Sequence, residues 1–120
     1  MKNVLFLDDV DDRWEAFKSN LPSQYQAFRA KNAYEAIGLL STETFDAVFL
    51  DHDLPDIHVS NGLSVAMFLA VCAHQFRELK IVIHSRNYYG NKSMCKVLPN
   101  AISWPGVWDF PAEIDRLLNN

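Results

Sequence analysis

The chain has 120 residues, the length of one ordinary domain, and we expect a single domain over residues 1–120. Its formal net charge is −4 and no basic run is visible, which argues against an extended nucleic-acid-binding surface. No stretch approaches the ~20 apolar residues of a membrane span, and the first residues lack a signal-peptide pattern. We therefore expect a cytoplasmic protein, and the two cysteines, far from any metal-like cluster, fit a reducing compartment.

Short apolar runs alternate with helical patterns along the chain. The pattern predicts five strands, at residues 4–7, 25–30, 45–50, 79–83 and 101–104. A predicted helix follows each strand. In chain order, these helices are one capped by Asp11 or Asp12, one capped by Asn32, one over 62–74, one over about 92–97 and one opened by Asp109 or Pro111. This alternation predicts a three-layer α/β fold, with a five-stranded parallel sheet ordered 2-1-3-4-5 and helices on both faces.

Polar residues follow three of the predicted strands at the point where each strand ends. Right-handed crossovers bring the carboxyl ends of all parallel strands to one edge of the sheet, where open α/β sheets bind ligands. The residues concerned are Asp8 and Asp9 after the first strand, Asp51, His52 and Asp53 after the third, and His84, Ser85 and Asn87 after the fourth. We expect Asp8, Asp9, Asp51 and Ser85 to line one depression at this edge.

Asp8, Asp9 and Asp51 directly follow apolar runs, so their carboxylates are expected to converge. Like charges at such distances repel and raise each other's pKa, and a bound divalent cation is the usual remedy. A site rich in carboxylate oxygens suits Mg²⁺ or Mn²⁺. The alternative, that acids cap helices or extend into water, is preferred for Asp11 and Asp12.

His52 and His84 end two strands that the predicted order makes neighbours. Imidazoles exchange protons near neutral pH, so two exposed histidines flanking one phosphate could act as acid and base. The alternative is a structural histidine bonded to a loop carbonyl. His58 and His74 have no such context, and we interpret them as structural or solvated. Ser85 and Asn87 could donate hydrogen bonds to phosphate oxygens.

These residues resemble those of response-regulator receiver domains, whose fold is flavodoxin-like. Asp8 and Asp9 are similar to the receiver's Mg²⁺-binding pair, Asp51 with Pro55 to the phosphoacceptor and its turn, and Ser85 and Gly62 to other receiver positions. One departure stands out. Receivers end their fifth strand with Lys-Pro, whereas this chain has Trp104-Pro105, so the lysine that holds the phosphoryl group is missing.

A narrower resemblance is to the receiver-derived family called cyclic-phosphate processing receiver domains. Its motifs are L-D-D with a nearby arginine, L-D-H-D-L, and H-S-x-N followed by a glycine and a methionine. The chain has Leu7-Asp8-Asp9 with Arg13, Leu50-Asp51-His52-Asp53-Leu54, and His84-Ser85-Arg86-Asn87 with Gly90 and Met94. The resemblance implies action on cyclic phosphates, such as a 2′,3′-cyclic RNA end or a cyclic nucleotide.

Two hypotheses follow. In the first, the chain is a metal-dependent phosphoesterase in which Asp8, Asp9 and Asp51 hold the cation and His52 and His84 serve as acid and base in either order. Asp51 belongs to the catalytic set, while Ser85, Asn87, Arg13 and Asp53 contact the substrate. In the second, the chain is a non-catalytic module, either a phosphoacceptor at Asp51 or a pseudo-receiver that binds a nucleotide or protein. Trp104 in place of lysine argues against the phosphoacceptor.

Overall fold

The computed structural model describes residues 1–53, 61–84, 87–104 and 111–119. Its elements are β1 (Lys2–Leu7), α1 (Asp11–Asn20), β2 (Tyr25–Ala30), α2 (Ala33–Thr42), β3 (Ala47–Leu50), α3 (Gly62–Val71), β4 (Lys80–Ile83), α4 (Tyr88–Val97), β5 (Ile102–Ser103) and α5 (Pro111–Asn119). The strands form one sheet in the order β2-β1-β3-β4-β5, and all neighbouring pairs are parallel. The predicted fold class and strand order are confirmed.

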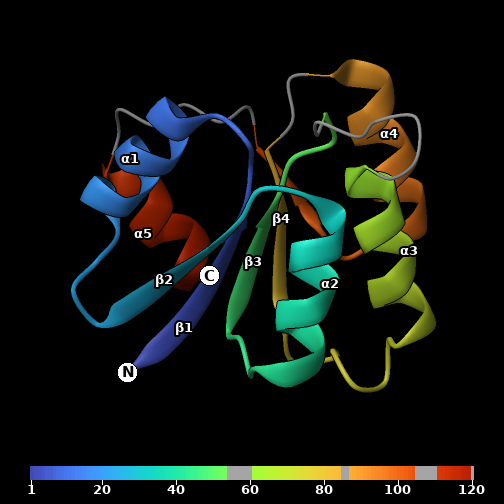
Figure 1. Ribbon diagram of the computed structural model, residues 1–120, viewed down its shortest axis with the longest axis horizontal. Coiled ribbons are helices and arrows are strands. Elements are labelled where there is room, and N and C mark those ends of the chain that lie inside the picture. The colour runs from blue at the N-terminus through green and yellow to red at the C-terminus, as the bar shows by residue number, and fades with distance from the viewer. Residues whose placement is uncertain (54–60, 85–86, 105–110, 120) are drawn as a thin grey trace.

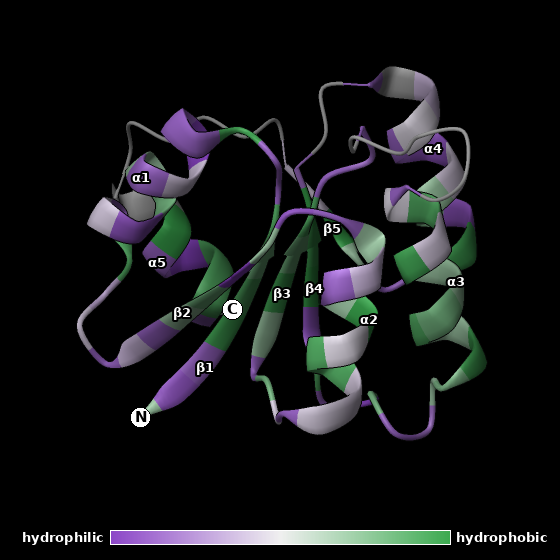
Figure 2. Cartoon of the chain, in the orientation of Figure 1, coloured by the Kyte–Doolittle hydropathy of each residue, from purple (hydrophilic) through white to green (hydrophobic). Residues whose placement is uncertain are grey.

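The sheet separates two helical layers, each with its own hydrophobic cluster. Helices α1 and α5 cover one face, and α2, α3 and α4 cover the other (Figure 1). Successive residues of a strand point to opposite faces, so Val4 and Phe6 of β1 pack towards α1 and α5, whereas Leu5 and Leu7 pack towards the other layer. Strands β3 and β4 are mostly hydrophobic (Figure 2), as expected for strands buried on both sides.

The helix boundaries differ from the sequence-based expectations at two N-termini. Asn32 caps α2 as predicted, because its side chain accepts from the Glu35 amide. The prediction that Asp11 or Asp12 caps α1 was wrong: the N-cap is Val10, and both aspartates lie in the first turn. Helix α4 begins at Tyr88 rather than near residue 92, because Asn87 accepts a hydrogen bond from the Gly90 amide and so starts the helix earlier.

The strand register builds a row of residues just beyond the sheet. Leu7 pairs with Leu50, Leu50 with Ile83, and Ile83 with Ser103. The next residue on each strand belongs to what we call the terminal row, which consists of Asp8, Asp51, His84 and Trp104. The hydrogen-bond ladder of the sheet continues through this row. The amides of Asp51, His84 and Trp104 each donate to the last carbonyl of the neighbouring strand in the sheet (β1, β3 and β4, respectively), at 2.8–3.0 Å. Sheet pairing thus fixes their backbones side by side.

None of the helices in the described part of the chain is long and apolar enough to cross a membrane.

Candidate functional site

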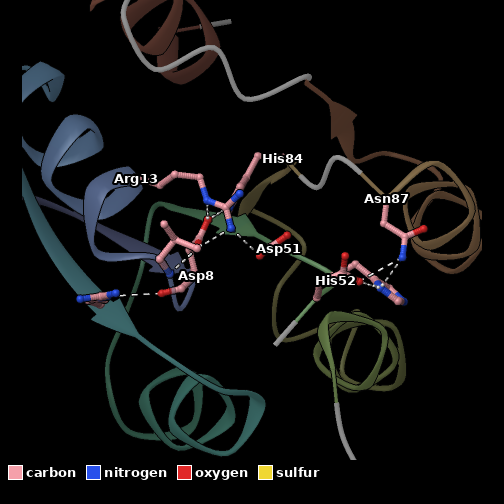
Figure 3. A network of polar contacts seen from close by, with 9 residues as sticks. Asp8, Arg13, Asp51, His52, His84 and Asn87 are labelled. Carbon is pink, nitrogen blue, oxygen red and sulfur yellow. Dashed lines mark hydrogen bonds and ion pairs between the residues drawn. The ribbon is translucent and has the colours of Figure 1, made fainter. Parts of the chain in front are cut away.

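Three side chains of the terminal row form a buried polar cluster. Asp8, Asp51 and His84 each offer one ligand atom, and these atoms lie within 4.8 Å of one another. Because each residue follows a strand at the same register, strand alternation points all three towards the α1 and α5 side (Figure 3). All three are almost inaccessible to solvent. Buried polar groups of this kind require partners, because leaving them unpaired is costly.

Asp8 is the centre of the cluster. Its Oδ1 accepts from the Val10 amide at 2.9 Å and from Arg13 Nη2 at 3.0 Å. Its Oδ2 lies 2.8 Å from Arg13 Nε and 3.0 Å from His84 Nε2. Burial alone would raise the pKa of Asp8, but the hydrogen bond and charge of His84, with those of Val10 and Arg13, hold this pKa below its usual value. Asp8 is therefore an ionised, fully bonded carboxylate.

Asp51 has a contrasting environment. Burial raises the pKa of its carboxyl, and the neighbouring charge of Asp8 raises it further, although His84 and Arg13 act in the opposite direction. The guanidinium of Arg13 reaches its Oδ2 at 3.4 Å. The protein therefore favours the ionised form of Asp8 and disfavours the ionised form of Asp51. Asp51 is the one that would gain from a further positive charge.

His84 is held rigidly. Its imidazole stacks on the ring of Phe6, with centroids 5.0 Å apart and planes 5° apart. Since the ionised carboxylate of Asp8 can only accept, His84 Nε2 is the donor in their hydrogen bond. The expectation that His84 lies at an exposed strand end was wrong: the terminal row is covered, and the side chain is 1% exposed.

His52 belongs to a separate group on the other side of the sheet edge. It follows Asp51 directly, so alternation directs it towards α4, where it lies apart from His84 (Figure 3). Its Nδ1 lies 2.9 Å from Asp53 Oδ1. His52 is also less exposed than expected, with 13% of the side chain accessible. The structure therefore does not place the two histidines in one bonded pair.

Asp53 and Asn87 orient the His52 ring. Asn87 Nδ2 donates to Asp53 Oδ1 at 3.0 Å, while Asn87 Oδ1 accepts from the Gly90 amide. Hydrogen bonds from His52 and Asn87 lower the pKa of Asp53. An ionised Asp53 can only accept, so Nδ1 of His52 carries the proton and Nε2 offers the lone pair. Asn87 was expected to donate a hydrogen bond to phosphate, but in the structure its amide bonds to Asp53 and Gly90.

Two glycines are required by close approach. A Cβ at Gly90 would overlap the imidazole of His52, and a Cβ at Gly62 would overlap the backbone carbonyl of Asp51. The Gly62 amide also donates to the His52 carbonyl at 3.0 Å. Both glycines therefore let a helix pack directly on the strand end that presents Asp51 and His52. The motif position of Gly90 was visible in the sequence, but its contact with His52 was not.

Arg29 is a residue that the sequence reasoning missed. Its Nε donates to the backbone carbonyl of Asp8 at 3.3 Å, and its Nη1 lies 2.8 Å from Asp11 Oδ1. The guanidinium also lies over Trp14, 5.9 Å from the ring centroid. Arg29 thus ties β2 to the loop that carries Asp8. The sequence signal for Arg29 was its position inside a predicted strand whose apolar and polar residues alternate, as in a half-buried strand.

The remaining candidates lie at the margin or outside the described residues. Asp9 is half-buried and is not part of the ligand group formed by the described residues. Ser85 and His58 lie outside the described residues, and His74 is exposed. Trp104 is 4% exposed and packs edge-on against Phe49, with centroids 6.2 Å apart. The end of β5 thus contributes an indole to the core, where a lysine would contribute a charge.

The donor set fits a divalent cation. Two buried carboxylates and an imidazole, with atoms within 4.8 Å, could share one ion. Burial and the charge of Asp8 raise the pKa of Asp51, and a cation bound beside it would favour the ionised form. Carboxylate oxygens suit Mg²⁺ or Mn²⁺, whereas imidazole is a more usual ligand of iron, zinc and other transition metals.

The fold is similar to that of solved receiver domains. The response regulator TrrA of Thermotoga maritima, solved in complex with Mg²⁺-BeF, is 24% identical with a TM-score of 0.72, and the match covers 98% of this chain and 99% of TrrA. A signal receiver domain of an HD domain-containing protein from Pseudomonas fluorescens Pf-5 is 18% identical with a TM-score of 0.75, covering 98% and 90%. A CheY-like receiver from Methanospirillum hungatei JF-1 is 21% identical with a TM-score of 0.69, covering 99% and 94%. At these identities the likeness establishes the fold.

No curated protein matches the sequence. The model of the family described as the cyclic-phosphate processing receiver domain matches residues 3–100. This span contains the ligand group of Asp8, Asp51 and His84 as well as the His52, Asp53 and Asn87 group. It also contains Gly90, which packs under the His52 ring. The motifs, the receiver fold and the family match agree, and the chain belongs to the cyclic-phosphate processing receiver domain family.

Proposed function

We propose that the chain is a metal-dependent phosphoesterase that opens a cyclic phosphodiester, such as a 2′,3′-cyclic phosphate at an RNA end or in a cyclic nucleotide. One observation carries the proposal: the terminal row combines two buried carboxylates with an imidazole and ends in a buried tryptophan. A phosphoacceptor needs a cation to hold the phosphoryl oxygens, and the indole of Trp104 cannot supply one. The family description names cyclic-phosphate processing, in agreement with this composition.

Asp8 and Asp51 would hold the cation, and His84, whose Nε2–H donates to Asp8, would keep that carboxylate in position. When bound, Mn²⁺ or Mg²⁺ supplies Lewis-acid polarisation of the phosphate and a more acidic bound water. Asp9 stays a proposed ligand from the sequence, at the half-buried margin of the site. The rigid packing of His84 on Phe6 keeps the imidazole in place without a cost at each turnover.

His52 is the proposed proton-transfer group. Hydrolysis adds water to phosphorus, breaks one ring P–O bond, and returns a proton to the departing ribose oxygen, which leaves a phosphomonoester and a hydroxyl. Asp53 accepts from Nδ1 of His52 and so leaves Nε2 free to receive a proton from water and deliver it later. Asp53 and Asn87 act as positioning residues in this scheme. Ser85 stays a proposed hydrogen-bond donor to the phosphate oxygens.

A second candidate is a phosphoacceptor at Asp51. It is favoured by one observation, that a cationic side chain other than lysine, Arg13, lies 3.4 Å from the Asp51 carboxylate. Such a chain would act as a signalling receiver and would not turn over cyclic phosphates.

One experiment separates the candidates. The protein is incubated with 2′,3′-cyclic AMP and Mn²⁺ or Mg²⁺, and products are resolved by anion-exchange chromatography. In parallel, it is incubated with acetyl phosphate and Mg²⁺, and intact mass is measured. The esterase proposal expects a metal-dependent phosphomonoester product and little phosphorylated protein. A stable phosphorylated protein that is lost in Asp51→Asn, without cyclic-phosphate turnover, would establish the phosphoacceptor instead.

A further inference from the structure

Arg13 contacts both carboxylates that the proposed cation would use. Its side chain reaches from the first turn of α1 and contacts Asp8 side-on, with Nε 2.8 Å from Oδ2 and Nη2 3.0 Å from Oδ1 (Figure 3). The same Nη2 lies 3.4 Å from Asp51 Oδ2. One guanidinium therefore bridges both carboxylates of the cluster.

Asp8 has little room for a further ligand. Its carboxylate accepts hydrogen bonds from the Val10 amide, His84 Nε2 and Arg13 Nη2, and Arg13 Nε adds an ion-pair contact at 2.8 Å. A divalent cation on the same oxygens would repel the guanidinium of Arg13, so we expect the two to compete for Asp8.

Arg13 is the donor best able to leave. The Val10 amide is fixed by the backbone at the start of α1. The imidazole of His84 is 1% exposed and stacked on Phe6, so it has little room to move. The side chain of Arg13 is 27% exposed, and its long stem can carry the guanidinium outward without disturbing the helix.

We propose that Arg13 is an exchangeable internal counter-ion. In the metal-free protein its guanidinium neutralises Asp8 and Asp51, and a divalent cation displaces it towards the mouth of the site. There it binds the phosphate of the substrate, replacing the cation that β5 lacks at Trp104. The cation therefore binds first and prepares the phosphate site. This inference rests on the proposed cation site and adds the order in which cation and phosphate bind.

The test compares Arg13→Gln with the wild-type protein and with Arg29→Gln. Arg29 contacts the same loop through the Asp8 carbonyl, but its ion pair among the described residues is with Asp11 rather than with the Asp8 or Asp51 carboxylate. Mn²⁺ affinity is measured by the free-ion electron paramagnetic resonance signal, and inorganic phosphate affinity by calorimetry with saturating Mn²⁺. Arg13→Lys is a second variant that keeps the charge but cannot bind side-on with two nitrogens. Circular dichroism establishes that each variant is folded.

We expect Arg13→Gln to bind Mn²⁺ about 5- to 150-fold more tightly, the usual range of a coupling between two ligands. It should bind phosphate at least about tenfold more weakly, whereas Arg29→Gln should change both affinities by less than about threefold. Arg13→Lys should fall between wild type and Arg13→Gln. In the wild-type protein, the Arg13 Nε–H resonance should move towards the value of a free guanidinium on addition of diamagnetic Mg²⁺.

Unchanged or weaker Mn²⁺ binding by a folded Arg13→Gln variant would overturn the inference. Absence of Mn²⁺ binding in all variants would overturn both the inference and the cation site. If the affinities shift as expected but the wild-type protein does not open a cyclic phosphate, the counter-ion stands and the proposed function fails.

Discussion

At the scale of single residues, adjacent positions in this chain have opposite roles because a strand alternates. Asp51 faces Asp8 and Arg13, whereas His52, the next residue, faces Asp53 and Asn87. The buried carboxylate and the oriented imidazole are therefore presented by one strand end to two sides of the same sheet edge. The proposed metal-binding role of Asp51 and the proposed proton-transfer role of His52 can therefore be tested one residue apart.

We predict that His52→Ala lowers turnover of 2′,3′-cyclic AMP by about 10²- to 10⁴-fold, the usual contribution of a general acid or base. The fold should be retained, since removing this side chain at the edge leaves both hydrophobic clusters intact. Initial rates at saturating substrate provide the measurement. His74→Ala is the matched control, because His74 is exposed and should be replaceable without effect. Equal rates for the His52 variant and wild type would contradict the role.

We predict a pH-dependent stability effect at Asp11. The hydrogen bond and charge of Arg29, with the charge of Lys31, lower the pKa of Asp11 in the folded protein. A lowered folded pKa stabilises the fold above the unfolded value of about 3.9, and this contribution is lost as the pH falls through the folded value. Asp11→Asn should therefore melt below wild type at pH 7, and the difference should shrink as the pH falls through the lowered folded pKa of Asp11.

Asp12→Asn is the control for Asp11. Both aspartates lie in the first turn of α1, so both interact with the helix dipole, but the described residues give an ion pair for Asp11 alone. Because Asp11 is exposed, the difference between the variants should also shrink at high salt. Identical melting curves at pH 7 and low salt would show that the Arg29 pair contributes nothing.

At the scale of elements, the site depends on how closely α4 approaches β3. Gly90→Ala places a Cβ into the His52 ring, so we predict destabilisation by about 1–3 kcal/mol, the usual cost of overpacking. A Cβ at Gly38 in α2 would meet nothing within 4 Å, so Gly38→Ala should instead stabilise by roughly 0.5–1 kcal/mol through helix propensity. Urea unfolding of both variants gives the comparison, and equal effects would show that Gly90 is not constrained by His52.

Much of the element pattern could be predicted because it depends on local chemistry. Apolar runs that end in acids gave β1 and β3, and alternation with helices gave the parallel sheet and its order. Proximity of Asp8, Asp51 and His84 followed from the shared edge. The burial of His84 could not be predicted, because it depends on stacking with Phe6 from another strand. The contact of Arg13 with Asp51 likewise depends on where α1 packs.

At the scale of the whole molecule, the buried charge of the site lowers the stability of the metal-free fold. Burial and the charge of Asp8 raise the pKa of Asp51, so at neutral pH its ionised form destabilises the metal-free fold. We predict that Asp51→Asn raises the metal-free melting temperature by about 2–5 °C, as roughly 1 kcal/mol does in a domain of this size. Millimolar Mn²⁺ should raise the wild-type melting temperature by mass action and the variant's by less.

Calorimetry with and without Mn²⁺ measures these shifts. Asp46→Asn is a control at the opposite, amino-terminal end of β3, where Asp46 accepts from the Asn3 amide. It should lower the melting temperature equally with and without metal. A metal-free Asp51→Asn variant less stable than wild type would show that Arg13 and His84 compensate the buried charge in full.

Trp104 gives the molecule an intrinsic optical reporter. Its indole follows β5 in the same row as Asp8, Asp51 and His84, and it packs edge-on against Phe49. The energy of an excited indole shifts with nearby charge, so replacing a guanidinium by a divalent ion a few strands away should change its emission. With Trp14 and Trp108 replaced by phenylalanine, Trp104 would be the single tryptophan left. Its fluorescence during a Mn²⁺ titration should then follow occupancy of the site, and an emission that stays constant while Mn²⁺ binds would show that the row is not electrostatically coupled along its length.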